Sequence, residues 1–225
     1  LGVRDVPLVI LTHPHADHIN GLPGVHRDRR VGAVVTTPHA TGLPQSARLS
    51  ADLARRRIPE HTAQPGTRWQ LGPSELTVLG PDGPSSSGGP SSSEGPSSFE
   101  GPGEGSAANN ASIVLHVRWR AGSALLSGDI EVEAQGRLLR GHLPQADILK
   151  VPHHGSPSQV PDFFAAVRAR AALVSVGAGN GYGHPAPSTL ALLQRAGTRV
   201  YRTDKSGDIA VIDQGGQLAV VISGR

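Results

Sequence analysis

Short apolar runs, rather than long amphipathic stretches, dominate the chain of 225 residues. Continuous runs of roughly four to eight residues bounded by turn signals are typical of strands that are buried on both faces. Stretches between some of them carry apolar residues at helical spacing and predict helices. The strands are expected at 6–11, 31–36, 76–79, 112–119, 123–126, 147–151, 172–176, 199–203, 208–213 and 217–222, and the helices at 45–57, 131–139, 160–170 and 187–196. This interleaving predicts an α/β fold whose sheets are covered by helices on their outer faces.

Residues 81–108 interrupt the pattern. They are rich in glycine, serine and proline, and the unit Gly-Pro-Ser-Ser recurs in them. Such a segment cannot bury enough apolar surface to offset the entropy lost on ordering. Because apolar runs resume on both sides, we expect a single domain over 1–225 with a flexible surface insertion at 81–108, and no domain boundary.

Composition narrows the class of protein. The chain has no cysteine, which excludes disulfides, thiolate metal sites and cysteine nucleophiles. No apolar run reaches the roughly 18 residues of a membrane helix, so we expect no transmembrane segment and a soluble domain. The net charge of +3 permits an acidic partner without requiring one. The chain begins at Leu1 and contains no methionine, and we interpret it as a fragment of a longer protein.

Two arginine groups, at 27–30 and 55–57, offer contacts for nucleic-acid phosphates. Each group is also ordinary for a solvated face, and we favour that interpretation. Phe, Trp and Tyr together make up only 3% of the residues, so no interleaved stacking platform for single strands is visible. Charge and aromatic content therefore do not by themselves indicate nucleic-acid binding.

Candidate chemistry begins directly behind the first apolar run, in the string Thr-His-Pro-His-Ala-Asp-His. Strand alternation places His13 and His15 on one side, and Asp17 and His18 turn with the chain into the next loop. The segment thus offers two imidazoles to one metal ion and a carboxylate with an imidazole to a second. Imidazole and carboxylate ligands suit zinc, manganese or iron. A polar surface cluster is the less favoured alternative.

Three later apolar runs also end in ligand-type residues. Asp129 follows 123–126, His153 and His154 follow 147–151, and His184 lies in the loop after 172–176. Side chains at the carboxyl ends of strands face a crevice, so these strand ends together supply the donors of a two-metal site. Taken singly, Asp129 could cap the next helix and His184 could pack within its loop.

The strings THPHADHINGL, LLSGDIEVEAQ, DILKVPHHGS and YGHP resemble the metallo-β-lactamase superfamily, and within it the carboxyl-terminal domain of ComEC-type DNA-uptake proteins. The resemblance implies an αββα sandwich of four layers with a di-metal centre that holds two divalent ions, zinc or manganese. It also implies a phosphodiester hydrolase, a nuclease acting on DNA during uptake. The implied partners are single-stranded DNA and the membrane channel domain of a parent protein in the cell membrane.

The chain departs from the family pattern in two places. The superfamily domain has strands before its H-x-H-x-D-H motif, whereas twelve residues precede His13 here. We therefore expect a sandwich without its first strands, and an unpaired edge on the strand 6–11. The middle histidine ligand also has no counterpart, because Asn109, Asn110 and Ser112 occupy its region. One metal is then less completely coordinated, or a later histidine compensates.

The resemblance assigns His13 and His15 to the first metal, Asp17 and His18 to the second, and Asp129 to a bridge. One histidine of the VPHHGS string completes the second metal's shell, and the other acts near the scissile phosphate as a proton donor or a hydrogen-bond donor. The predicted metal ligands are His13, His15, Asp17, His18, Asp129, His153, His154 and His184, and the predicted catalytic residues are Asp17, His153 and His154.

Several assignments stay open at this point. Lys150 either neutralises developing negative charge or pairs within the fold, and Ser156 either contacts phosphate or caps the next helix. The remaining histidines are expected to be surface or structural residues: His26, His39, His61, His116 and His142. Two rival functions remain, a metallo-hydrolase of another ester (a phosphorylcholine-type phosphodiester or a lactone) and a non-catalytic domain that binds metal or DNA.

Overall fold

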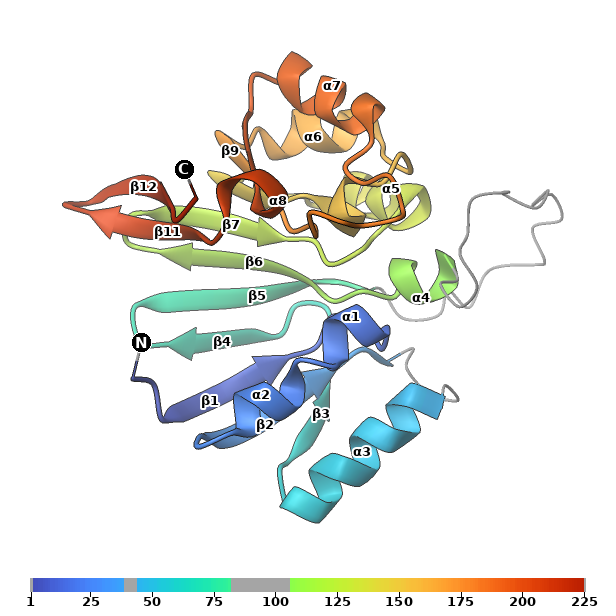
Figure 1. Ribbon diagram of the computed structural model, residues 1–225, viewed down its shortest axis with the longest axis vertical. Coiled ribbons are helices and arrows are strands. Elements are labelled where there is room, and N and C mark those ends of the chain that lie inside the picture. Colours follow the sequence, from blue (N-terminus) through green and yellow to red (C-terminus); the bar gives the residue numbers. More distant parts are fainter. Residues whose placement is uncertain (1, 39–43, 82–105, 225) are drawn as a thin grey trace, which may run out of the picture.

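The computed structural model describes residues 2–38, 44–81 and 106–224. Two sheets lie face to face between two layers of helices (Figure 1). The first sheet is parallel and has the order β1-β2-β3, and the second has the order β10-β9-β8-β7-β6-β5-β4. The strands of these sheets are β1 (Asp5–Ile10), β2 (Arg30–Thr36), β3 (Glu60–Thr62), β4 (Arg68–Leu71), β5 (Ser74–Gly80), β6 (Val114–Trp119), β7 (Gly122–Leu126), β8 (Ile148–Lys150), β9 (Ala171–Val174) and β10 (Arg199–Arg202). The layering confirms the predicted α/β sandwich.

Helices cover the outer face of each sheet (Figure 1). Beside the first sheet lie α1 (Ala16–Ile19), α2 (Leu22–His26) and α3 (Pro44–Arg56). Beside the second lie α5 (Val132–Arg140), α6 (Pro161–Val167) and α7 (Pro187–Arg195). The two short helices α4 (Ser106–Asn110) and α8 (Thr203–Ser206) lie in connections, and the chain closes with the hairpin β11 (Ile209–Gln214) and β12 (Gln217–Ile222).

Alternation along β7 and β8 explains why the second sheet is covered on both faces. Leu125 and Leu149 pack with Phe163 of α6 in the outer core. Their neighbours Ala124 and Ile148 point to the inner face, as the two-residue period of a strand requires. Both faces are therefore apolar, which is why these strands appear in the sequence as continuous apolar runs.

Two different elements cover the inner face of the second sheet. Over β5 and β6, Val78 and Leu115 pack against Val35 of the first sheet. Over β7 to β9, the hairpin β11–β12 takes the place of the first sheet, and its Leu218 and Val220 join the inner cluster. The inner layer is therefore built from both ends of the chain.

Strand β1 lies at one edge of the first sheet and pairs only with β2 among the residues that the structure describes. The expected unpaired edge is thus present. No helix within 2–38, 44–81 or 106–224 is long and apolar enough to cross a bilayer.

Some expected boundaries are wrong. Helix α6 ends at Val167, three residues early, because Arg168 adopts a left-handed conformation (φ 54°) that closes the helix. The predicted insertion is too long at its end, since 106–108 begin α4. Its residues 82–105, and with them most of that prediction, lie outside the described residues. The short elements α1, α2, α4, α8, β3 and β4 have too little periodicity to be predicted.

Candidate metal centre

Three strands deliver the candidate donors to one place. Strands β1 and β7 run in the same direction in the view of Figure 1, and β8 is parallel to β7, so their carboxyl ends meet at one edge of the sandwich. At that edge, Asp17, His18, Asp129 and His154 each offer one donor atom, and the four atoms lie within 4.8 Å of one another. The predicted convergence of strand ends is therefore present for these four residues.

Asp129 lies at the centre of this group and is only 2% exposed. Its Oδ2 lies 3.1 Å from Nε2 of His18 and 3.1 Å from Nε2 of His154, and its Oδ1 accepts a bond from Lys150 Nζ at 3.2 Å. Burial alone would raise the pKa of Asp129. The hydrogen bonds from His154 and His18 and the charge of Lys150 outweigh it, so its pKa is well below the usual range. Asp129 is therefore a fixed negative charge.

Asp17 approaches the same two imidazoles from the solvent side. Its Oδ2 lies 3.3 Å from His18 Nε2 and 3.2 Å from His154 Nε2. The hydrogen bond to His154, then the one to His18, lowers the pKa of Asp17. Burial opposes the charged form of His154, yet its bonds to Asp129 and Asp17 raise its pKa to about 9. The pKa of His18 is raised in the same way, against burial.

The two carboxylates thus favour the protonated form of both imidazoles when no cation competes. Two carboxylates and two imidazoles within one small volume are the donor set of a divalent transition-metal site. These residues therefore fit a metal ion of the kind that the sequence predicts.

A second pair of imidazoles adjoins the group. Nε2 of His13 lies 2.9 Å from Nδ1 of His15, and the His13 ring lies 4.0 Å from that of His18 between centroids. Both side chains are buried. Burial, and next the charge of His18, lowers the pKa of His13 to about 3, so its ring is neutral. A neutral imidazole is the form that binds a metal.

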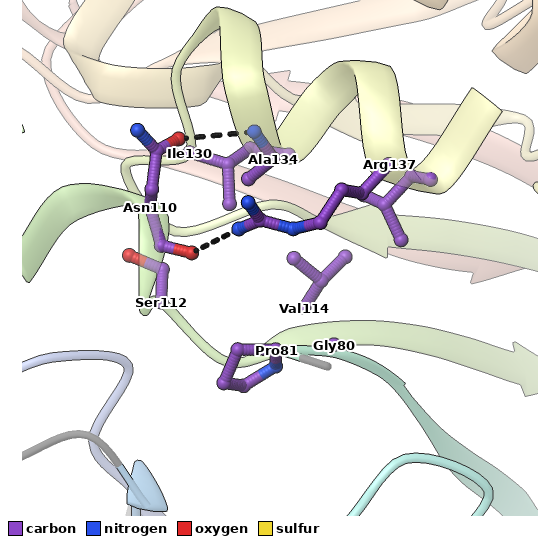
Figure 2. A pocket seen from close by; sticks show the side chains of 9 residues that line it. Gly80, Pro81, Asn110, Ser112, Val114, Ile130, Ala134 and Arg137 are labelled. Atoms are coloured by element: carbon purple, nitrogen blue, oxygen red, sulfur yellow. Dashed lines mark hydrogen bonds between the residues drawn. The ribbon is translucent and has the colours of Figure 1, made fainter. Parts of the chain in front are cut away.

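Ser112, one of the three residues in the region without the expected middle histidine, links His13 to Asp129. Its Oγ lies 3.1 Å from Nδ1 of His13 and accepts a bond from the backbone N–H of Asp129 at 3.0 Å. Asn110 serves a different purpose, because its Oδ1 accepts from the N–H of Glu131 and of Ala134 at the start of α5. Figure 2 shows the bond with Ala134. Ser112 therefore contacts His13 through a hydroxyl, and it adds no imidazole to the centre.

The turn after β8 separates its two histidines. His153, His154 and Gly155 follow one another with φ of 44°, 52° and 82°, all left-handed. This conformation is costly for residues with a Cβ, of order 1–3 kcal/mol each, and such strain is concentrated at functional sites. The two rings diverge as a result, with centroids 6.2 Å apart.

His154 points to the donor group, and a backbone carbonyl fixes its tautomer. Its Nδ1 lies 2.6 Å from the carbonyl oxygen of Ser175. A carbonyl only accepts, so Nδ1 carries a proton and Nε2 faces Asp17 and Asp129. The hydroxyl of Thr12 lies 2.9 Å from Nδ1 of His18 and orients that ring, but a hydroxyl can donate or accept, so it does not fix the tautomer. Such outer partners orient metal-binding histidines.

His153 lies beside the group rather than in it. Its Nδ1 is 3.0 Å from Glu131 Oε1, and its ring meets that of His184 at 5.3 Å between centroids. His184 contacts His153 and Tyr182 and is not among the four converging donors. The structure therefore answers one question that the sequence left open: His154 joins the donor group, and His153 and His184 form a second cluster with Glu131.

The other open assignments also become clear. Lys150 pairs within the fold, through Asp129 and the Gly128 carbonyl. Ser156 is buried, and α6 begins five residues after it with Val160 at its N-cap, so Ser156 does not cap that helix. His26, His61, His116 and His142 lie outside the donor group, as expected, and His39 lies outside the described residues.

Several residues of the site were missed by sequence reasoning. Glu131 carried a usable signal, because it follows Asp129 by two positions behind the same strand. Thr12 and Ser175 carried none, since their contributions depend on contacts across the fold. Position 128 requires glycine for two reasons. Its φ is +55°, and an added Cβ would lie only 2.6 Å from the Cβ of Ser112.

The arginine groups make local contacts. Arg55 and Arg56 pair with Asp52 on the same helix, and Arg29 donates to the carbonyl oxygens of Val3 and Gly24. These bonds agree with a solvated surface, the interpretation favoured from the sequence.

Residues 1–174 match the sequence profile of the metallo-beta-lactamase superfamily. The chain therefore belongs to this superfamily, and its four converging donors form a potential metal-binding group.

Individual known proteins are also similar to this chain. The chain is 28% identical over 210 residues to ComE operon protein 3 of Bacillus subtilis (strain 168). The alignment covers 92% of this chain and 25% of that protein. It thus spans about a quarter of the length of this curated relative. Among solved structures it is similar to CmlA, a diiron beta-hydroxylase from Streptomyces venezuelae, with a TM-score of 0.51 and 15% identity over 90% of this chain and 44% of that one. The metallo-beta-lactamase fold protein YhfI from Bacillus subtilis aligns with a TM-score of 0.48 and 10% identity over 87% and 74% of the two chains.

Proposed function

We propose that the chain hydrolyses phosphodiester bonds of DNA with the help of two divalent metal ions, zinc or manganese. The observation that carries the proposal is the convergence of Asp17, His18, Asp129 and His154 next to the pair His13–His15. The substrate is supported by the resemblance to ComEC-type DNA-uptake proteins and the match to ComE operon protein 3. In this proposal the DNA is single-stranded, and the membrane channel of a longer parent protein delivers it.

The residues divide into two ligand sets in this proposal. His13 and His15 hold one ion, Asp17, His18 and His154 hold the other, and Asp129 lies between the sets. When bound, such ions supply a hydroxide near neutral pH and neutralise charge on the phosphoryl oxygens. Lys150 holds Asp129 Oδ1, so that Oδ2 stays turned toward His18 and His154.

His153 is the proposed proton donor to the leaving oxygen. It lies next to the donor group without being part of it, and its Nδ1 lies 3.0 Å from Oε1 of Glu131. A histidine next to the reacting group and close to a carboxylate is suited to general acid catalysis.

The test measures hydrolysis of single-stranded DNA and of bis-p-nitrophenyl phosphate in the presence of Mn²⁺ or Zn²⁺. Wild type is compared with Asp129→Asn, and Asp162→Asn on the exposed start of α6 serves as the matched control. We expect Asp129→Asn to lose activity at least about 100-fold, because the fixed charge between the two ligand sets is gone. Asp162→Asn should retain it.

Other outcomes decide between the rival functions. Cleavage of the small ester but not of DNA would favour a metallo-hydrolase of small esters. If wild type binds metal but is as inert as Asp129→Asn on both substrates, the hydrolase proposal is refuted and a non-catalytic binding domain replaces it.

A further inference from the structure

An exposed tyrosine stands beside the metal centre. Tyr182 is 63% exposed, and it is the only aromatic residue among the exposed large apolar side chains of the described part of the chain. The other tyrosine, Tyr201, packs into the inner core under the hairpin β11–β12. Exposing a large ring to water forgoes the stabilisation that its burial would bring. Core packing therefore does not explain why an aromatic residue occupies this position.

Tyr182 lines the same cleft as two of the donors. The cleft has a volume of about 310 Å³, and Asp17 and His154 line it together with Tyr182 and His184. This volume is at the lower end of the roughly 300–1,000 Å³ of small-molecule sites. A ligand in the cleft can therefore reach the metal centre and the tyrosine ring at the same time.

The loop presents the ring in a fixed and open position. Asn180 donates to the carbonyl oxygens of Gly177 and His184 and accepts from the N–H of His184, which ties the ends of the loop together. The ring of Tyr182 is stacked with that of His184, at 6.0 Å between centroids and 27° between planes. An added Cβ on Gly181 or Gly183 would meet no atom within 4 Å, so no other segment crowds the backbone next to Tyr182.

We propose that Tyr182 is a stacking residue for a nucleobase of the substrate strand, next to the nucleotide whose phosphate lies at the metal centre. The inference rests on the proposed function and specifies its substrate as a strand with unpaired bases. A base within a duplex is stacked on its neighbours, so a single tyrosine favours a single strand. Stacking is independent of base identity, because every base has a π-face.

The experiment compares two labelled strands of about ten nucleotides, a length within the site sizes of single-strand binders. One is oligothymidylate, and the other has the same phosphates but abasic residues. Binding is measured by fluorescence anisotropy in EDTA, and cleavage as kcat/KM in Mn²⁺. The proteins are wild type, Tyr182→Ala, Tyr182→Phe and, as a control in an exposed apolar side chain of β11, Ile212→Ala.

We expect Tyr182→Ala to weaken oligothymidylate binding, or to lower kcat/KM, by about 5- to 150-fold, the range that corresponds to the loss of one stacked base. The abasic strand should be unaffected, because it has no base to stack. Tyr182→Phe and Ile212→Ala should behave as wild type on both strands.

The outcomes separate this inference from the proposed function. Equal losses on both strands, no loss on either, or no preference of wild type for the strand with bases would overturn the stacking role, even if DNA is cleaved. A Tyr182-dependent preference in binding without any cleavage would support stacking and refute hydrolysis. If oligothymidylate neither binds nor is cleaved, both proposals fail.

Discussion

At the scale of the residue, the left-handed turn after β8 gives two adjacent histidines different surroundings. His154 meets two carboxylates, whereas His153 meets Glu131 and His184. We predict that His154→Ala lowers the bound metal, because one of the four converging donors is lost. His153→Ala should keep the metal and lower the rate of hydrolysis about 100-fold or more, the scale of a general acid.

Elemental analysis of the purified variants, paired with rates on DNA, checks this prediction. His142→Ala is the control, since His142 is exposed and outside the donor group. Equal metal loss in His153→Ala and His154→Ala would contradict the division of roles.

The raised pKa of His154 makes metal binding depend on pH. Without metal, this pKa rises from 6.5 to about 9, so the ring carries a proton at neutral pH. That proton must leave before Nε2 binds a cation, so affinity for Mn²⁺ should increase with pH by up to about tenfold per unit, and level off above the folded-state pKa.

The stability of the metal-free chain should change in the opposite sense. A raised histidine pKa stabilises the fold fully below 6.5, and this contribution is lost as pH rises toward about 9. Titration of Mn²⁺ and thermal unfolding in EDTA, each as a function of pH, measure the two trends. A pH-independent affinity across this range would show that His154 is not charged in the metal-free state.

At the scale of the element, a buried glutamine connects the helices to the histidine turn. Gln135 of α5 is fully buried, donates to Ile130 O and Gln159 Oε1, and accepts from the N–H of Val160. Gln159 in turn donates to Pro152 O in the turn itself. The left-handed conformation of the turn is therefore maintained by a polar network between α5 and α6.

We predict that Gln135→Leu lowers the free energy of unfolding by about 2–6 kcal/mol, because it leaves at least two buried polar groups without partners, at roughly 1–3 kcal/mol each. Metal affinity should fall with it. Gln70→Leu, at an exposed position on β4, should change stability by less than about 0.5 kcal/mol. Denaturant unfolding measures both, and equal small effects would show that the network is dispensable.

This network also shows what the sequence could and could not predict. The positions of Asp129 and His154 at strand ends were predictable, because an apolar run followed by a polar donor can be recognised in the local sequence. Parallel strands then bring their carboxyl ends together by a general rule. By contrast, Gln135 looks like any polar helix residue. The divergence of His153 from His154 follows from positive φ angles at two positions where the sequence has histidine and not glycine. Contacts that depend on the assembled fold leave no local pattern.

At the scale of the whole molecule, the hairpin β11–β12 completes the inner layer of the sandwich. Val220 of β12 packs on the second sheet, and its neighbour Val221 is 48% exposed on the other face. We predict that Val220→Asp costs several kcal/mol, since it buries a charge among apolar side chains. Val221→Asp, one residue away, should cost less than about 0.5 kcal/mol. Comparable unfolding midpoints for the two variants would contradict the assigned faces.

The location of the donors between the two sheets has a consequence for the integrity of the domain. His18 and Asp17 follow a strand of the first sheet, whereas Asp129 and His154 follow strands of the second. A cation held by all four would cross-link the two sheets, which otherwise pack through apolar contacts. Chelation should then lower the melting temperature, since an ion at about 100 times its Kd adds ~2.7 kcal/mol. Chelation should also destabilise the segments that carry the donors before the core strands. Amide exchange should therefore become faster in α1 and in 152–155 than in β7. If EDTA leaves the melting temperature of the metal-loaded protein unchanged, the metal does not stabilise the packing of the two sheets.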